Sequence, residues 1–296
     1  MKRYLPSLCV VLGAACWGTI GVFNRQLAAA GVTMGTTVVL RNTGALVLLT
    51  VYFLCFRRQV FHIHWRHLPL FLGSGLISVV GLSWTYFTCQ RMCSLAVAAI
   101  LLYLAPSFVV IAGAVLWKAP LTPRRIAALA LSLAGCALVS GVAGGDLEVS
   151  ATGLLLGVAA GMCYASYTVF AHYALEHYDS YTMTYWTFVA AGLGALVFLR
   201  PADLAATLSQ PQGRLGALGL AVVSTVLPYL LYTRGLEGVE SGLASVMANV
   251  EPVVAALIGI LLFHEVPDLW TGLGIALVLC GVVLLAAGKE KANGKA

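Results

Sequence analysis

The chain has 296 residues, of which 60% are hydrophobic and only 9% are charged, with a formal net charge of +6. A water-soluble domain carries about 25% charged residues. This composition excludes a water-soluble globular protein and predicts a polytopic membrane protein. The eight cysteines are scattered and form no CxxC pair, so they indicate no redox compartment.

Ten predominantly apolar segments are close to the length of about 20 residues that a transmembrane helix needs. In chain order they cover residues 5–25, 35–56, 69–88, 94–117, 124–142, 152–173, 181–199, 214–234, 242–263 and 270–287. Short connections separate them and carry most of the charges. No alternating pattern of β-barrel strands occurs, so the predicted fold class is an all-α integral membrane protein. A cleavable signal peptide is not expected.

The lysines and arginines of the short connections predict the orientation. If the amino terminus is inside, 12 of the 17 Lys and Arg residues lie in inside segments, 4 lie outside, and Arg41 lies within a span. This bias predicts a multi-pass protein of a bacterial-type plasma (inner) membrane. Both termini are expected in the cytoplasm and the connection 143–151 outside. The positive charge is therefore attributed to topology, and no nucleic-acid partner is expected.

The two halves of the chain resemble each other. Residues 95–138 align without gaps with residues 241–284 at an offset of 146. The most informative identical pairs are Pro106 with Pro252, Gly113 with Gly259, and Gly135 with Gly281. Because each half has five spans, the second half enters the membrane from the opposite side. The sequence thus predicts two inverted five-helix repeats, residues 1–142 and 152–287, followed by a cytoplasmic tail at 288–296.

Pro106 and Pro252 occupy equivalent positions in the fourth and ninth predicted spans. Proline removes a backbone hydrogen bond and crowds the preceding turn, so each is expected to interrupt its helix. Helices interrupted at corresponding positions of two inverted repeats mark the binding region of many carriers. A helix-break and gating role is therefore predicted, and the alternative is that both prolines only kink helices for packing.

Arg41 and Glu251 are charged residues within predicted spans, and their repeat equivalents, Ala191 and Ala105, are uncharged. A charge inside a membrane is expensive and is by default a functional candidate. One half thus supplies a cation and the other an anion, as a carrier of a zwitterion would need. The alternatives are snorkelling or carbonyl capping by Arg41, and satisfaction by Glu251 of backbone groups freed by Pro252. Whether the two charges pair directly stays open.

Glu251 is also the candidate proton site, because alternating access would expose its carboxylate to each side in turn. Asn249 lies two residues earlier, which is about 200° around an intact helix. Both side chains would then not face one cavity. Glu251 is favoured for the cavity, and Asn249 is retained as a candidate substrate-binding residue.

Aromatic residues within the spans are the other candidates for binding substrate. Trp17 and Tyr164 occupy matching positions in CWGTIGVF (16–23) and CYASYTVF (163–170), well inside their spans. The weaker candidates are Trp84, Tyr86, Tyr103 and Tyr232. Tyr229 shares a span with Tyr232 and is a candidate of the same kind, but it is not included in the predicted site. The alternative for all of them is an anchoring role at the membrane interface.

Glycines recur every fourth residue in the sixth predicted span, at Gly153, Gly157 and Gly161. This GxxxGxxxG pattern is typical of helices whose backbones approach closely. It predicts a tight helix contact rather than a binding site.

The sequence resembles the EamA-type branch of the drug/metabolite transporter superfamily. The residues that carry the resemblance are GAACWG (13–18), LRNTGALVL (40–48), the YLAP of the fourth span, VEPVVAALIGILLFHE (250–265) and GLGIALVLCGVVLL (272–285). The resemblance implies ten-helix carriers that work by alternating access, many of which export amino acids or other small metabolites. Members tend to carry an acidic residue after the fourth span of each repeat. Glu265 fits this pattern, but its counterpart is Ala119.

No enzymatic signature is present. The chain has no P-loop and no GxSxG, and the HExxH-like start at His264 fails because position 268 is Asp. No catalytic residue, metal site or cofactor is therefore expected. The prediction is a secondary-active or facilitative carrier of a small organic metabolite, an amino acid or related amphipathic solute, with export as the expected direction. The expected partners are the substrate and the lipid bilayer, with protons as an open alternative.

Two other function classes stay open. A non-transporting structural or accessory membrane subunit would have a solid core without a cavity. A membrane-embedded enzyme is the other alternative. The sequence leaves the substrate, the direction, the coupling ion and the oligomeric state undetermined.

Overall fold

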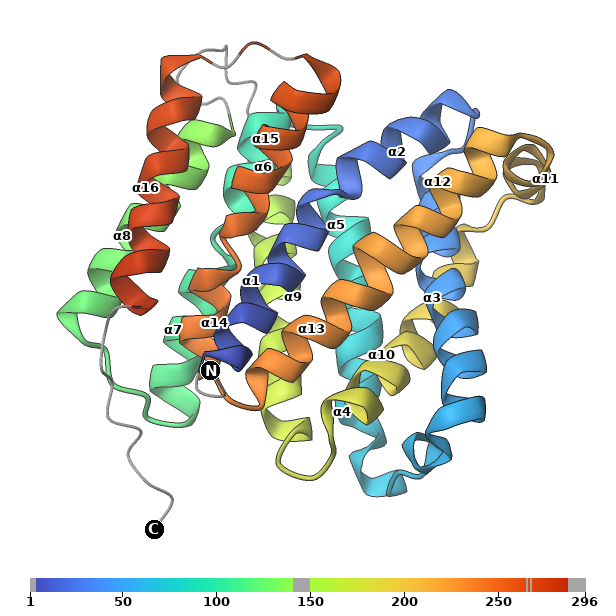
Figure 1. Ribbon diagram of the computed structural model, residues 1–296, viewed down its shortest axis with the longest axis horizontal. Coiled ribbons are helices and arrows are strands. Elements are labelled where there is room, and N and C mark those ends of the chain that lie inside the picture. The colour runs from blue at the N-terminus through green and yellow to red at the C-terminus, as the bar shows by residue number, and fades with distance from the viewer. Residues whose placement is uncertain (1–3, 141–149, 265, 267, 287–296) are drawn as a thin grey trace.

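The computed structural model describes residues 4–140, 150–264, 266 and 268–286, and every regular element in these ranges is helical (Figure 1). The α-helices are α1 Leu5–Gly18, α2 Ile20–Ala29, α3 Met34–Phe56, α4 Leu68–Leu72, α5 Leu82–Cys89, α6 Leu95–Leu102, α7 Ala105–Leu116, α8 Pro123–Val139, α9 Ala151–Ala174, α10 Ser180–Ala195, α11 Pro201–Ser209, α12 Pro211–Ala221, α13 Leu227–Leu236, α14 Ser241–Met247, α15 Val250–Phe263 and α16 Leu269–Ala286. Short 3₁₀ turns cover Arg58–Phe61, Trp65–His67 and Leu196–Phe198. The connection 143–149, Glu265 and the tail at 288–296, about which the sequence made predictions, lie outside the described residues.

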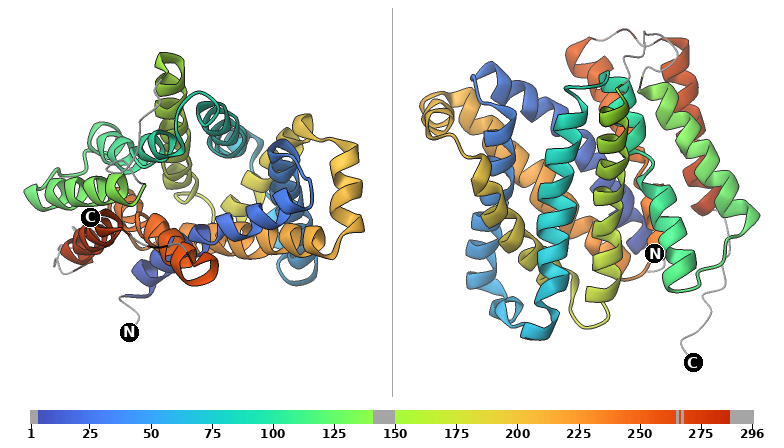
Figure 2. Two further views of the ribbon diagram at one scale, coloured as in Figure 1. Left: turned by 90° about the horizontal axis from the view of Figure 1, so that it is seen from above. Right: turned by 180° about the vertical axis from the view of Figure 1, so that it is seen from behind.

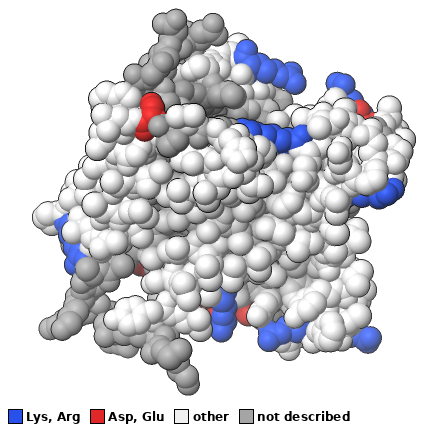
Figure 3. Space-filling model, turned by 45° about the horizontal axis from the view of Figure 1, so that its top comes forward, with Lys and Arg blue, Asp and Glu red and all other residues white. Residues whose placement is uncertain are grey.

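Eight helical segments of the described chain are long and apolar enough to cross a membrane. They match eight of the ten predicted spans, and several of them join consecutive helices, such as α1 with α2 and α6 with α7. The other two predicted spans correspond to α8 and α16, which are shorter, at 17 and 18 residues. In Figure 3 the charged side chains gather toward the two ends of the molecule, with a wide uncharged belt between them. The chain is an all-helical, multi-pass integral membrane protein.

Polar side chains fix the starts of several helices. Thr33, Ser94, Thr122, Ser150 and Asp179 each accept a hydrogen bond from the backbone N–H three residues later. The first N–H groups of a helix have no intrahelical acceptor, so such caps stabilise its beginning. The connections between the predicted spans therefore end in residues that specify where the next helix starts.

Both helices that contain the paired prolines are interrupted. The fourth predicted span divides into α6 and α7 around Tyr103, and the ninth divides into α14 and α15 around Asn249. Pro106 and Pro252 lie in the first turns of α7 and α15, where a missing N–H leaves no intrahelical acceptor unpaired. The first predicted span is also interrupted, at Thr19 between α1 and α2, which the sequence analysis did not anticipate.

The third and eighth predicted spans each contain a π-helical segment, Gly73–Gly81 and Val222–Val226. A π turn inserts an extra residue into the helix and rotates the side chains that follow it, and such turns often occur at functional sites. Nothing in the apolar pattern of either span predicted them. They occupy corresponding places in the two halves of the chain.

Glycines set the closest helix contacts. α8 and α16 lie side by side along one flank of the molecule, and α3, α11 and α12 lie along the opposite flank (Figures 1 and 2). A Cβ atom on Gly135 would lie 2.7 Å from the Gly274 oxygen, so these two backbones touch. A Cβ on Gly157 or Gly161 would come within 2.6 Å of Leu101. The predicted close contact of the glycine stripe is confirmed.

The main core lies between α1, α9, α10 and α13. Trp17, Tyr167, Phe188 and Tyr229 are all buried there, one from each of these helices. Tyr229 makes edge contacts with all three of the others, at ring-centroid distances of 5.3, 5.0 and 4.9 Å. Such T-shaped pairs are favourable beyond the area that they bury. This aromatic core lies directly beside the cavities.

Candidate functional site

A cavity of about 290 Å³ lies between the two halves of the chain. Asn24, Met34 and Gln90 line it at one end, near the turns that precede α3 and α6, whereas Trp17 and Glu251 line it at the other. The sequence predicts that the turns at the first end lie on the outer side of the membrane. The volume is at the lower limit of ordinary small-molecule sites, which begin at about 300 Å³.

Arg41 projects into this cavity from α3. Its Nε donates a hydrogen bond of 3.1 Å to Thr225 Oγ1, in the π-helical segment Val222–Val226. Within the described chain, Arg41 makes no ion pair with Glu251, although both line the same cavity. The direct pairing that the sequence left open is therefore absent from this conformation, and both charges face the cavity between them.

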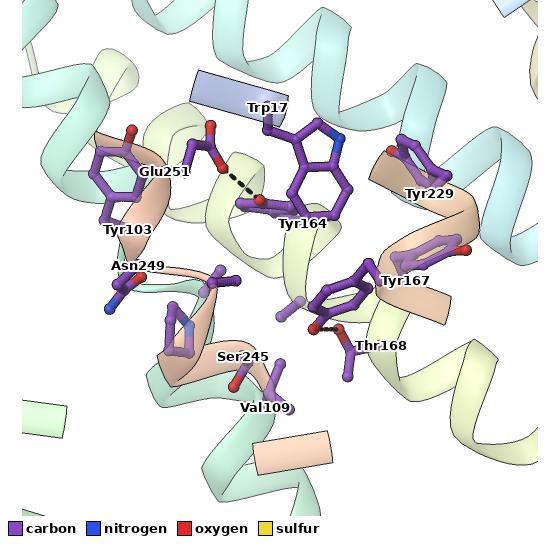
Figure 4. Close-up of a pocket in the computed structure, with 15 residues that line it drawn as sticks. Trp17, Tyr103, Val109, Tyr164, Tyr167, Thr168, Tyr229, Ser245, Asn249 and Glu251 are labelled. Atoms are coloured by element: carbon purple, nitrogen blue, oxygen red, sulfur yellow. Dashed lines mark hydrogen bonds between the residues drawn. The ribbon is translucent and has the colours of Figure 1, made fainter. Parts of the chain in front are cut away.

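Glu251 lies in the first turn of α15, directly after the interruption of the helix. A helix N-terminus favours a negative charge, because its unpaired N–H groups carry partial positive charge. The phenol of Tyr164 donates a hydrogen bond of 2.8 Å to Glu251 Oε2, and Figure 4 shows the two groups pointing toward each other. In this structure the Glu251 carboxylate accepts its hydrogen bond from Tyr164 and not from the backbone groups freed by Pro252.

Four aromatic residues form a layer at the end of the large cavity where Trp17 and Glu251 lie. Trp17, Tyr103, Tyr164 and Tyr229 line this cavity and also a second one, of about 30 Å³. The indole of Trp17 packs edge-on against the rings of Tyr164, at 6.1 Å, and Tyr229, at 5.3 Å (Figure 4). We call these four residues the aromatic layer. It separates the large cavity from the smaller one.

The smaller cavity, on the other side of the aromatic layer, contains several polar side chains. Ser245 and Asn249 line it from α14 and from the interruption before α15, and Thr168 lines it from α9. Thr168 Oγ1 and the Tyr232 hydroxyl are 2.9 Å apart and share a hydrogen bond. At about 30 Å³ this cavity has room for about two water molecules but not for a metabolite.

The structure brings together most of the residues predicted for the site. Trp17, Arg41, Tyr86, Tyr103, Tyr164 and Glu251 line the large cavity, and Tyr232, Asn249 and Pro106 line the smaller one. Pro252 is buried but lines neither. Asn249 and Glu251 both line the smaller cavity, contrary to the expectation for an intact helix, because Asn249 lies in the interruption and Glu251 lies in the first turn of α15.

Trp84 does not belong to the site. Its side chain is 54% exposed on α5 and lines neither cavity, whereas Tyr86 on the same helix lines the large one. Two residues along an α-helix are separated by about 200°, so only one of this pair can face the interior. The prediction for Trp84 was wrong for that reason.

Several residues of the site were missed. Tyr229 is part of the aromatic layer, and its spacing of three residues before Tyr232 could have placed both on one helix face. Thr225 had no such signal, because its orientation depends on the π-helical turn. Asn24 and Gln90 lie near the ends of predicted spans, where polar residues are ordinary. The described residues contain no group of three His, Cys, Asp or Glu that could hold a metal ion.

The comparisons with known proteins agree with this architecture. The EamA-like transporter family matches residues 5–141 and, separately, residues 151–287. The uncharacterized transporter YwfM of Bacillus subtilis is 26% identical over 299 residues, covering 98% of this chain and 97% of the relative. An uncharacterized transporter of Archaeoglobus fulgidus is 29% identical over 279 residues, covering 93% and 94%. YicL of Salmonella typhimurium, an uncharacterized inner membrane transporter, is 26% identical over 295 residues, covering 94% of each chain.

One crystal structure superposes on this fold with a TM-score of 0.81. The alignment covers 95% of this chain and 96% of that chain at 18% sequence identity, which shows a shared fold. The two family matches span nearly the whole sequence, and the relatives that match almost end to end are named transporters. This membrane protein therefore belongs to the EamA-like transporter family.

Proposed function

We propose that the protein carries a small zwitterionic metabolite, an amino acid or a related amphipathic solute, by alternating access. The observation that carries this proposal is the 290 Å³ cavity, in which the guanidinium of Arg41 and the carboxylate of Glu251 face the same space without pairing. A substrate carboxylate suits Arg41 and a substrate amine suits Glu251. The aromatic layer contributes surface for the apolar part of the solute. A structural subunit would have no need of this cavity.

Ten spans in two inverted repeats are part of the proposal. α8 and α16 supply the two shorter spans, and they pack against each other along their lengths. The helix interruptions around Tyr103 and Asn249 differ by 146 residues, which is the offset of the sequence repeat. The π-helical segments, at Gly73–Gly81 and Val222–Val226, also correspond. Carriers of this design move the halves around a fixed central site.

The proposed setting is a bacterial-type plasma membrane with both termini in the cytoplasm. This orientation rests on the excess of Lys and Arg in the segments that would be inside. The large cavity would then open to the outside, and the smaller one would lie on the cytoplasmic side of the aromatic layer. Export is the proposed direction, on the resemblance to exporters alone.

We assign proton coupling to Glu251. Its carboxylate lines both cavities, so it is the group that a change of access would expose to each side in turn. The Tyr164 hydroxyl lies beside this carboxylate, between the two cavities. It would keep a hydrogen bond to Glu251 in either protonation state, because it can donate to the ionised carboxylate and accept from the protonated one. A proton could therefore be loaded on one side and released on the other.

The test uses purified protein in proteoliposomes. Uptake of a labelled amino acid, in competition with the other amino acids, is measured with and without a pH gradient. Glu251→Gln keeps the shape of the side chain but cannot titrate. The proposal expects this variant to lose accumulation driven by the pH gradient while it keeps exchange of substrate for substrate.

Other results have definite meanings. If accumulation and exchange fall together, Glu251 binds the amine and does not couple protons. If both stay at the wild-type rate between pH 5.5 and pH 8, Glu251 has only a structural role beside Pro252. If the wild-type protein moves no amino acid at all, the zwitterion proposal is wrong.

A further inference from the structure

Thr225 connects the π-helical segment of the eighth span to the candidate substrate site. Its hydroxyl accepts a hydrogen bond of 3.1 Å from Arg41 Nε and lies 2.7 Å from the carbonyl oxygen of Leu220, to which it donates. Thr225 is fully buried. The next residue toward the amino terminus, Ser224, shares a hydrogen bond of 2.7 Å with Thr19 at the interruption between α1 and α2. The π turn thus directs two consecutive hydroxyls to two different neighbouring helices.

The two hydrogen bonds of Thr225 fix its polarity. A hydroxyl has one proton to donate and lone pairs with which to accept. Because a carbonyl can only accept, the proton of Thr225 is committed to Leu220, and its oxygen presents lone pairs to Arg41. The carbonyl that it uses lies five residues back, a distance along the chain that the π turn makes reachable. The turn therefore builds an acceptor that suits an arginine.

The acceptor engages one edge of the guanidinium. A guanidinium has five N–H donors in a rigid plane, and one of its edges presents Nη1 and Nη2 together. Since Nε is held by Thr225, the plane of the group is fixed and the Nη1–Nη2 edge is left for the cavity that Arg41 lines. That edge matches the two oxygens of a carboxylate in a bidentate arrangement.

We propose that Thr225 is a positioning residue, which holds Arg41 by Nε so that its Nη1–Nη2 edge binds the carboxylate of the substrate. This inference rests on the proposed function and deepens it, because it assigns the preference for substrates with a carboxylate to a hydrogen bond within the protein, between Arg41 and Thr225. Without Thr225, the guanidinium would rotate toward Glu251, the carboxylate that lines the same cavity, and the two charges would neutralise each other.

The first experiment needs no substrate. Phenylglyoxal forms an adduct across the two terminal nitrogens of an arginine, and its rate of reaction with Arg41 can be followed by peptide mass spectrometry of the purified protein. The variants are Thr225→Val, which removes the hydroxyl at constant shape, and Thr225→Ser, which retains it. Thr43→Val is the matched control, because Thr43 lies on α3 two residues after Arg41 but its hydroxyl donates to the carbonyl oxygen of Gly192. We expect slower modification of Arg41 in Thr225→Val only.

The second experiment measures selectivity with L-leucine and L-leucinamide, which differ in the carboxylate. In Thr225→Val we expect the KM for leucine uptake to rise about tenfold, as for the loss of about 1.4 kcal/mol, with kcat within twofold. The preference for leucine over leucinamide as a competitor should fall by the same factor. Thr225→Ser and Thr43→Val should behave as wild type.

The two experiments separate the two ideas. Unchanged modification of Arg41 in Thr225→Val, in protein that elutes as a single species, overturns the positioning role whatever is transported. A loss of kcat for leucine with an unchanged preference for leucine over leucinamide would make Thr225 a folding residue, which also overturns it. If wild-type protein takes up no amino acid but the modification rate changes as expected, the positioning role stands and the proposed function fails.

Discussion

Arg41 is the only Lys or Arg among the described residues that line the large cavity. It is held at Nε by Thr225, and a carboxylate would meet its two remaining terminal nitrogens. Lysine keeps the charge but offers a single nitrogen, so it cannot make the planar two-point contact. We expect Arg41→Lys to raise the KM for an amino acid about tenfold, which corresponds to about 1.4 kcal/mol, with normal amounts in the membrane.

Uptake kinetics in proteoliposomes check this prediction. The amount of folded protein, from fluorescence-detected chromatography, controls for expression. Unchanged transport and unchanged apparent affinity would mean that Arg41 only reaches toward the membrane interface, which is the alternative that its sequence position left open.

The four substrate-binding candidates that charge or repetition singled out in the sequence all line the large cavity. Arg41 and Glu251 were noticed because a charge within a span needs a reason, and Trp17 and Tyr164 because they occupy matching positions. The sequence did not predict which side chains face the cavity where this depends on their direction around a helix. Trp84 points outward although Tyr86 points inward, and Thr225 faces Arg41 only because a π turn changes the helical phase before it.

At the scale of helices, the contact between α8 and α16 depends on two glycines whose backbones touch. A Cβ on Gly274 would lie 2.7 Å from the Gly135 oxygen, a distance that requires the helices to move apart. We expect Gly274→Ala to destabilise the protein by about 1–3 kcal/mol, as overpacking does. The thermal unfolding of purified protein in detergent provides the measurement.

Gly272 is the matched control on the same helix. A Cβ there meets no atom within 4 Å, so Gly272→Ala adds helix propensity without a clash. We expect it to be neutral or slightly stabilising. Equal loss of stability in both variants would contradict the close contact and indicate instead that α16 needs glycines for another reason.

The junction between α3 and α11 depends on Asp203. Its carboxylate accepts hydrogen bonds from the hydroxyls of Thr33 and Thr36 and from the backbone N–H of Thr33, and these bonds hold the pKa of Asp203 below its usual range. Because the folded-state pKa is lowered, the stabilisation is complete above the ordinary carboxyl pKa of about 3.9. It is lost as the pH falls through the folded-state value.

We therefore expect the unfolding temperature of the wild-type protein to fall as the pH is lowered below about 4. Asp203→Asn should be less stable than wild type at pH 7 and should show a weaker pH dependence in this acid range. Parallel pH profiles for the two proteins would show that other carboxylates control the acid response.

Eight of the ten predicted spans coincide with helices long enough to cross a membrane, because a hydrophobic run of membrane length leaves few alternatives to a helix. The interruptions around Tyr103 and Asn249 could be inferred from the prolines that follow them. The interruption at Thr19 has no proline to announce it, although Gly18 and Gly21 flank it, and the Thr19 hydroxyl there shares a hydrogen bond with Ser224. The π-helical segments likewise depend on neighbouring helices, which a single chain pattern does not contain.

At the scale of the whole molecule, the end opposite the large cavity is closed. α7 packs against α14 there, and the indole of Trp117 stacks on the ring of His172 at 4.1 Å. Arg125, at the start of α8, is buried and binds Glu240 with both terminal nitrogens, one of them at 2.8 Å. This pair joins the two halves of the chain. In the proposed orientation it lies at the cytoplasmic side.

Breaking this pair should favour opening toward the cytoplasm. A charged hydrogen bond contributes about 1.5–3 kcal/mol, so we expect Arg125→Gln to increase the population of the inward-open state about tenfold or more. The probe is Ser245→Cys, which places a thiol at the small cavity, in a background without the native cysteines. Its labelling by an impermeant thiol reagent in inside-out vesicles should become correspondingly faster.

Arg234→Gln is the control for this experiment, because Arg234 pairs with Glu237 three residues away on its own segment and joins no separate helices. Its labelling rate should equal that of the protein with Arg125 and Arg234 intact. If Arg125→Gln and Arg234→Gln label alike, the Arg125–Glu240 pair does not hold the cytoplasmic side closed.

The Arg125–Glu240 pair also makes the two sides of the carrier unequal. The positions related to it by the 146-residue offset are Thr271 and Ser94, which cannot form an ion pair. In the proposed orientation the large cavity lies on the outer side and this pair on the cytoplasmic side, so we expect the empty protein to rest open to the outside. A zwitterion too bulky to pass the aromatic layer would therefore reach its target from the external medium, without entering the cell. Such a compound would block the protein at once, before a single transport cycle and in cells that have no energy supply.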